Sequence, residues 1–209
     1  MVKDLKKQTE KFWSGSSGNQ YILRTNNSEH LKSNISFFKR VIKKKYRIKN
    51  ILEFGCNIGL NLEAINYIDK KINLTGVDIN KQAIDVLKSK NIANAFKDTL
   101  YNFKTRKKFD LTFTKGVLIH IPPKHLSEIY QKLFNYSNKY ILIAEYFSPK
   151  PTKIKYRGFS DLLYKRDFAK DLIKKYNMDL VDYGFVYSLD KKNPLDDINW
   201  FLLKKKVWI

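Results

Sequence analysis

A short apolar run that ends in two glycines is the feature that most constrains the fold of this chain. Residues 51–54 read Ile-Leu-Glu-Phe, and Gly55 and Gly59 follow. A run of this length predicts a buried strand, and the glycines predict a turn. Leu60 and Ala64 then recur at helical spacing. A strand, a glycine turn and a helix form the opening of a mononucleotide-binding βαβ unit.

The glycine spacing argues against a dinucleotide-binding fingerprint. That fingerprint has three glycines, G-x-G-x-x-G, which bring a pyrophosphate onto the helix end. Here there are two glycines, and Glu53 stands two residues before the first. A carboxylate in a confined site repels a pyrophosphate, but it suits a ligand that carries an amine cation. A glycine turn in another kind of α/β protein remains an alternative at this point.

Strand and helix patterns alternate along most of the chain. Apolar runs predict strands at 50–54, 72–78, 92–96, 109–114, 140–145, 180–187 and 199–203. Helical patterns follow Ser28, Gly59, Asn80, Pro123 and Asp167. We expect residues 12–27 to form a loop and residues 147–166 to be irregular. The alternation predicts an α/β fold, with a doubly wound, mostly parallel, seven-stranded Rossmann-like sheet and an antiparallel edge.

Length and composition limit the class of protein. A chain of 209 residues is long enough for one domain with a full hydrophobic core. The apolar runs are strand-sized and too short to cross a membrane, and residues 1–7 lack the apolar stretch of a signal peptide. The single cysteine, Cys56, excludes an internal disulfide and a multi-cysteine zinc site. We therefore expect a cytoplasmic protein with no metal.

The net charge of +21 leaves two interpretations open. Such a charge attracts nucleic acid, anionic membranes or phosphorylated substrates. However, the excess is mostly lysine and lies largely on predicted helix surfaces and near the C-terminus, which favours solvated faces over a nucleic-acid footprint. Charge alone does not identify the substrate.

Two acids after later strands make the pattern more specific. Asp78 ends the second predicted strand, about twenty residues past the glycine turn, where α/β nucleotide folds place a carboxylate for ribose hydroxyls. Asp98 follows the third strand. With Glu53-x-Gly55-x-x-x-Gly59, these residues resemble the class I S-adenosylmethionine-dependent methyltransferases. The resemblance implies S-adenosylmethionine as cofactor and S-adenosylhomocysteine as product.

Longer stretches are similar to one group within that class. They cover roughly residues 12–203 and include Phe12-Trp13 with Gly18 and Tyr21, 114–121, 144–146, 156–158, 165–169, 182–187 and 196–203. These stretches resemble the pseudaminic acid biosynthesis-associated methylases. Phe147-Ser148 departs from that pattern. The resemblance implies methyl transfer to an oxygen or nitrogen of a small acceptor, a nonulosonic (pseudaminic-type) sugar or its nucleotide-linked form.

The resemblance also implies a set of site residues. The expected cofactor contacts are Trp13, Tyr21, Arg24, Glu53, Gly55, Asn57, Gly59, Asp78, Ile79, Asp98 and Lys115. His120 and Glu145 are candidate general bases, because both should emerge at the carboxyl edge of the sheet. For His120, simple packing in an apolar run is the alternative. The expected substrate contacts are Tyr146, Tyr156, Arg157, Lys165, Arg166 and Asp197.

These expectations give a single methyltransferase domain over residues 1–209. Residues 1–27 would be an N-terminal extension or lid, and residues 146–166 an acceptor-binding insertion. Two other functions stay open, an RNA or DNA methyltransferase and a non-catalytic protein that binds S-adenosylmethionine. Against a nucleic-acid enzyme, no N-P-P-[YF] sequence follows the fourth strand. A cytosine-C5 methyltransferase needs a thiol nucleophile, and the single cysteine, Cys56, lies in the glycine turn. We expect a small-molecule partner and no membrane; the oligomeric state stays open.

Overall fold

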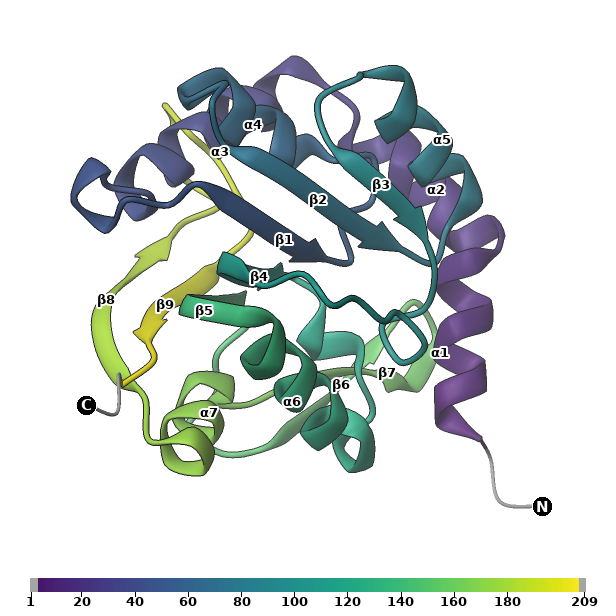
Figure 1. Ribbon diagram of the computed structural model, residues 1–209. Helices are drawn as coiled ribbons and strands as arrows, with labels where there is room; N and C mark the ends of the chain where they lie inside the picture. Colours follow the sequence, from purple (N-terminus) through teal and green to yellow (C-terminus); the bar gives the residue numbers. More distant parts are fainter. Residues whose placement is uncertain (1–3, 207–209) are drawn as a thin grey trace.

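The computed structural model describes residues 4–206, which form a central sheet between two helical layers (Figure 1). The sheet has seven strands in the order β3-β2-β1-β4-β5-β9-β8. Their bounds are β1 (Asn50–Phe54), β2 (Asn73–Asp78), β3 (Asn94–Lys97), β4 (Phe109–Lys115), β5 (Ser137–Glu145), β8 (Asp179–Val186) and β9 (Ile198–Lys204). Strands β1 to β5 run parallel, and β9 is antiparallel to both of its neighbours, β5 and β8. The predicted fold class is confirmed.

Seven α-helices accompany these strands in the described part of the chain. They are α1 (Leu5–Ser14), α2 (Ser16–Thr25), α3 (Ser28–Val41), α4 (Leu60–Ile68), α5 (Lys81–Ser89), α6 (Leu126–Tyr136) and α7 (Phe168–Tyr176). One apolar core joins the sheet to α3, α4 and α5, and a second joins it to α6 and α7. Figure 1 shows α1 beside the ends to which the β1 and β2 arrows point, so the first helices lie at the carboxyl edge of the sheet.

Residues 16–25 form helix α2, where the sequence predicted a loop. The serine- and glycine-rich composition favours a loop, but a tertiary contact decides otherwise, because Ile22 is buried against Ile58 and Ala83. Gly18 is required where α2 passes α1, since a Cβ there would lie 1.9 Å from the Trp13 carbonyl oxygen. Burial of one apolar face therefore overrides local propensity.

Residues 147–166, predicted to be irregular, contain a hairpin of β6 (Thr152–Tyr156) and β7 (Phe159–Lys165). Tyr156 pairs with Phe159, so the turn consists of Arg157 and Gly158. Both turn residues have positive φ, 48° and 84°. This is the left-handed conformation that two-residue hairpin turns require. The missed signal is the Arg-Gly pair between two runs of alternating residues.

The turn between β1 and α4 is left-handed at Gly55 (φ 71°), Asn57 (φ 47°) and Gly59 (φ 73°). A Cβ on Gly59 would lie 2.3 Å from the Leu87 side chain of α5. Gly59 is therefore needed for helix packing, whereas the sequence analysis assigned it to the ligand.

We predict that Gly59→Ala destabilises the protein more than Gly158→Ala. Both substitutions carry the cost of a left-handed alanine, roughly 1 kcal/mol, but a Cβ on Gly158 meets nothing within 4 Å. The overlap with Leu87 should add about 1–3 kcal/mol at Gly59. Urea unfolding of the two variants measures the difference, and equal midpoints would contradict the packing role of Gly59.

Candidate active site

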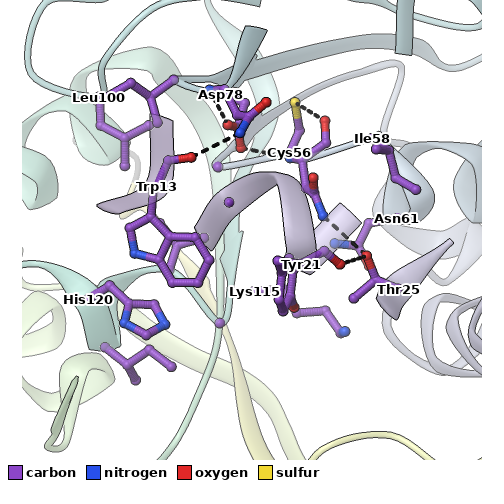
Figure 2. Close-up of a pocket in the computed structure, with 18 of the residues that line it drawn as sticks. Trp13, Tyr21, Thr25, Cys56, Ile58, Asn61, Asp78, Leu100, Lys115 and His120 are labelled. Atoms are coloured by element: carbon purple, nitrogen blue, oxygen red, sulfur yellow. Dashed lines mark hydrogen bonds between the residues drawn. The ribbon is translucent and has the colours of Figure 1, made fainter. Parts of the chain in front are cut away.

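A cavity of about 520 Å³ lies at the carboxyl edge of the sheet, between the strand ends and helices α1 and α2. Most of the predicted cofactor contacts line it: Trp13, Tyr21, Arg24, Gly55, Asn57, Asp78, Ile79 and Lys115. Figure 2 shows several of these side chains around the same space, with Trp13 and Tyr21 contributed by the first two helices. A volume of this size suits a small organic molecule.

The Asp78 carboxylate ties the first two loops of the cavity together. Its Oδ2 accepts a hydrogen bond from the Asn57 backbone N–H at 2.8 Å, and its Oδ1 accepts one from the Asn80 N–H, also at 2.8 Å. Burial raises the pKa of Asp78, and these backbone donors oppose the rise. Asp78 is partly exposed and lines the cavity, so a ligand has access to it.

Glu53 lies fully buried below the cavity. Its Oε1 accepts a hydrogen bond from Asn61 Nδ2 at 2.6 Å, and burial raises its pKa to about 8. Glu53 Oε2, Asn61 Oδ1 and Asn34 Oδ1 are buried and find no hydrogen-bond donor within residues 4–206. Asn34 and Asn61 both line the cavity. Unsatisfied buried acceptors are costly, so this end of the cavity favours a ligand that donates hydrogen bonds.

Asn80 holds the junction of α1 and α2 over the cavity. Its Nδ2 donates to the Trp13 carbonyl at 3.0 Å and to Asn19 Oδ1 at 2.8 Å, while its Oδ1 caps α5 by accepting from the Ala83 N–H. One side chain therefore fixes both a helix start and the N-terminal segment that covers the site.

His120 is buried in the wall of the cavity. Its ring is 4.7 Å from the Trp13 ring and 5.4 Å from the Tyr156 ring, between centroids. Nδ1 lies 2.6 Å from the Leu162 carbonyl oxygen. Because a carbonyl only accepts, Nδ1 carries the proton and Nε2 has the free lone pair. Burial lowers the pKa of His120 to about 4, so the ring is neutral near pH 7.

Glu145, the other candidate base, does not line the cavity. Its Oε1 accepts from the backbone N–H groups of Val117 and Leu118 at 3.0 and 3.1 Å, and its Oε2 accepts from the Ile119 N–H at 3.4 Å. The carboxylate therefore shapes the loop that follows β4. Burial raises its pKa to about 7 against the effect of these donors.

The predicted substrate contacts divide into two groups. Tyr146 and Tyr156 line the cavity, and Arg157, Lys165, Arg166 and Asp197 do not. Arg166 forms an ion pair with Asp171 at 2.9 Å. Asp197 is exposed and accepts from the Ser188 N–H at 2.8 Å, as part of its own loop.

Several lining residues escaped the sequence analysis, among them Asn34, Asn61, Thr99, Leu100, Tyr101 and Asp196. Asp98, Glu53 and Gly59 were predicted to contact the cofactor but do not line the cavity. Asp98 accepts from the Thr99 N–H at 2.7 Å, and the next three residues face the cavity in its place. A sequence motif identifies the loop after β3, but it does not show which of its side chains turns inward.

Comparison with known proteins identifies the class. Residues 52–135 match the protein family described as a methyltransferase domain. No curated protein sequence matches significantly. Magnesium protoporphyrin IX methyltransferase from Synechocystis PCC 6803, with bound S-adenosylhomocysteine, is similar in structure at 12% identity and a TM-score of 0.75, over 97% of this chain and 100% of that one.

Two further solved structures are similar over most of both chains. The plantazolicin methyltransferase BpumL, in complex with S-adenosylhomocysteine, has a TM-score of 0.66 at 19% identity, over 97% of this chain and 96% of that one. The N-methyltransferase NodS from Bradyrhizobium japonicum WM9 has a TM-score of 0.66 at 12% identity, over 88% and 99%. The structures show the fold, and the domain match over residues 52–135 supports methyl transfer. Together they support an S-adenosylmethionine-dependent methyltransferase.

Within residues 4–206, none of the helices is long and apolar enough to cross a membrane. The same range contains no cluster of three or more His, Cys, Asp or Glu residues with the arrangement of a metal site.

We predict that Asn80→Asp loosens the α1–α2 junction but leaves α5 in place. The carboxylate still accepts from the Ala83 N–H, whereas both donors to the junction are lost, each worth about 1 kcal/mol. Hydrogen exchange of residues 13–25 should therefore become roughly tenfold faster or more. Asn80→Ala also removes the cap on the Ala83 N–H, so hydrogen exchange should become faster at the start of α5 as well. Unchanged hydrogen exchange in residues 13–25 of the Asn80→Asp variant would show that the Asn80 side chain does not hold the α1–α2 junction.

We predict that His120 makes the protein less stable in acid. A histidine whose pKa is about 4 when folded and about 6.5 when unfolded binds more protons in the unfolded state across that window. The free energy of unfolding should therefore fall as the pH drops from about 6.5 towards 4, by up to about 3 kcal/mol from this residue. His120→Gln should lack this portion of the loss in urea unfolding at each pH. Parallel profiles for the variant and the wild type would be inconsistent with a buried neutral ring.

Proposed function

We propose that this methyltransferase acts on an oxygen or nitrogen of a small sugar acceptor, a nonulosonic (pseudaminic-type) sugar or its nucleotide-linked form. The observation that supports this proposal is the wall of the cavity formed by Tyr21, Tyr146 and Tyr156, with Lys115 beside it. Aromatic faces pack against sugar rings, tyrosine hydroxyls pair with sugar hydroxyls, and a lysine suits the carboxylate of an acidic sugar.

The opposite part of the cavity fits S-adenosylmethionine. Asp78 would accept from the ribose hydroxyls, and Leu100 and Tyr101 would flank the adenine. The unsatisfied oxygens of Asn34 and Asn61, with Glu53 behind them, suit the α-ammonium group, which has three N–H donors. Arg24 would pair with the carboxylate of the cofactor. When bound, the cofactor would supply a methyl group from its sulfonium, which becomes a neutral thioether once the methyl group is transferred.

The role of the protein in such a reaction is mainly alignment and exclusion of water. Trp13 and Tyr21 pack edge to face at 5.6 Å between ring centroids and cover the cavity from the N-terminal side. His120 and Tyr156 continue this wall. The neutral His120 ring adds no charge to this wall near pH 7. We therefore assign His120 to binding and orientation.

We predict that labelled methyl from S-adenosylmethionine enters a pool of pseudaminic acid and its cytidine-monophosphate ester, and not RNA or DNA. Asp78→Asn should reduce both transfer and S-adenosylhomocysteine affinity, by about 1.5–3 kcal/mol for a lost charged hydrogen bond. Asp85→Asn is the matched control, because Asp85 pairs only with Lys81 on the surface of α5 among the described contacts.

Each outcome of this experiment distinguishes the candidate functions. Label in RNA or DNA that falls steeply with salt would show a nucleic-acid methyltransferase and overturn the sugar acceptor. S-adenosylhomocysteine binding without label in any pool would favour a non-catalytic binding protein.

A further inference from the structure

The cavity has two ends of different chemistry. The cofactor end is formed by the loops after β1, β2 and β3, with Asp78, Asn57 and Thr99. The other end, which we call the acceptor end, is formed by Tyr21, Lys115, Tyr146, Tyr156 and Asp196. Asp196 comes from the loop between β8 and β9, far along the chain from the cofactor loops. No comparison and no motif assigns this residue a role.

Asp196 lies in the same cavity wall as Tyr146, Tyr21 and Lys115. Its negative charge adds to burial in raising the pKa of Tyr146, and in raising the pKa of Tyr21 to about 12. The same charge opposes the effect of burial on the pKa of Lys115. Asp196 is exposed enough for its oxygen lone pairs to accept from a bound molecule.

Among the described residues that line the cavity, Asp196 is the carboxylate placed for proton transfer from an acceptor. The other two lining acids are Glu10 and Asp78. Glu10 acts on Tyr101, beside the loop after β3, and Asp78 accepts from two backbone N–H groups at the cofactor end. Glu145, predicted from the sequence as a base, is occupied by backbone donors outside the cavity.

His120 is poorly suited to the same task. Its Nδ1 proton is committed to the Leu162 carbonyl, and its ring packs against the Trp13 and Tyr156 rings. A general base must lie within hydrogen-bond reach of the acceptor. An exposed carboxylate in the cavity lining meets this condition for an acceptor that enters beside it.

We propose that Asp196 is a catalytic residue that takes the proton from the acceptor during methyl transfer. The acceptor O–H or N–H bond breaks, its electron pair stays on the oxygen or nitrogen, and the proton binds to an Asp196 oxygen. A lone pair of that oxygen or nitrogen forms the new bond to the methyl carbon as the carbon–sulfur electron pair returns to sulfur. This inference rests on the proposed function.

Asp196→Asn and Asp197→Asn form a matched pair for the test. Asparagine keeps the size of the side chain and one oxygen acceptor, but it cannot take a proton. Asp197 is adjacent in sequence, yet its carboxylate faces the Ser188 N–H outside the cavity. With pseudaminic acid and its cytidine-monophosphate ester as acceptors, Asp196→Asn should lower kcat by roughly 100-fold or more. KM should change only a few-fold, and Asp197→Asn should match the wild type.

A reaction without a proton to remove separates catalysis from folding and cofactor binding. Methyl iodide and S-adenosylhomocysteine give S-adenosylmethionine and iodide, with no proton transferred. Asp196→Asn should form S-adenosylmethionine from these two reagents at the wild-type rate and should bind S-adenosylhomocysteine with wild-type affinity.

The possible failures are distinct. If the wild type methylates the sugar acceptors and Asp196→Asn matches Asp197→Asn, the catalytic role of Asp196 is overturned while the proposed function stands. A parallel loss of both reactions in Asp196→Asn would show a structural role and overturn the proposal in the same way. If the wild type reacts with methyl iodide but methylates neither sugar, the proposed acceptor is wrong and the inference falls with it.

Discussion

The hydrogen bonds from two backbone N–H groups to the Asp78 carboxylate organise the site. The turn after β1 is left-handed at three positions, and such a turn needs a fixed partner to hold one conformation. Asp78, at the end of β2, accepts from Asn57 in that turn and from Asn80 at the start of α5. Adjacent parallel strands bring these groups to the same edge, so one carboxylate sets the geometry of two loops.

Asn80 connects these two loops to the N-terminal helices. Its backbone is held by Asp78, and its side chain reaches the Trp13 carbonyl. The Trp13 ring in turn packs on His120, which is bonded to the Leu162 carbonyl in β7. A continuous set of contacts therefore connects the cofactor loops to the N-terminal cover and to the β6–β7 hairpin. The site depends on segments that lie far apart in the sequence.

Carboxylates near the carboxyl edge of the sheet serve different purposes according to their neighbours. Glu53 is buried beside unsatisfied amide oxygens, Glu145 is surrounded by backbone donors, and Asp196 is exposed in the lining of the cavity. A carboxylate held by several donors is committed to the fold, whereas one with free lone pairs can receive a proton or a ligand. Position at the end of a strand is thus not sufficient evidence for catalysis.

The sequence by itself determined the sheet, the glycine turn after β1 and the place of Asp78, because strand length, helix spacing and positive-φ residues are local properties. Tertiary structure decided the rest. Helix α2 forms because Ile22 is buried against distant residues, and Glu145 turns away from the cavity because the loop after β4 supplies its donors. In the Asp196-Asp197 pair, only the path of the β8–β9 loop determines which carboxylate faces the cavity. Such contacts join residues far apart in the chain, and no local pattern encodes them.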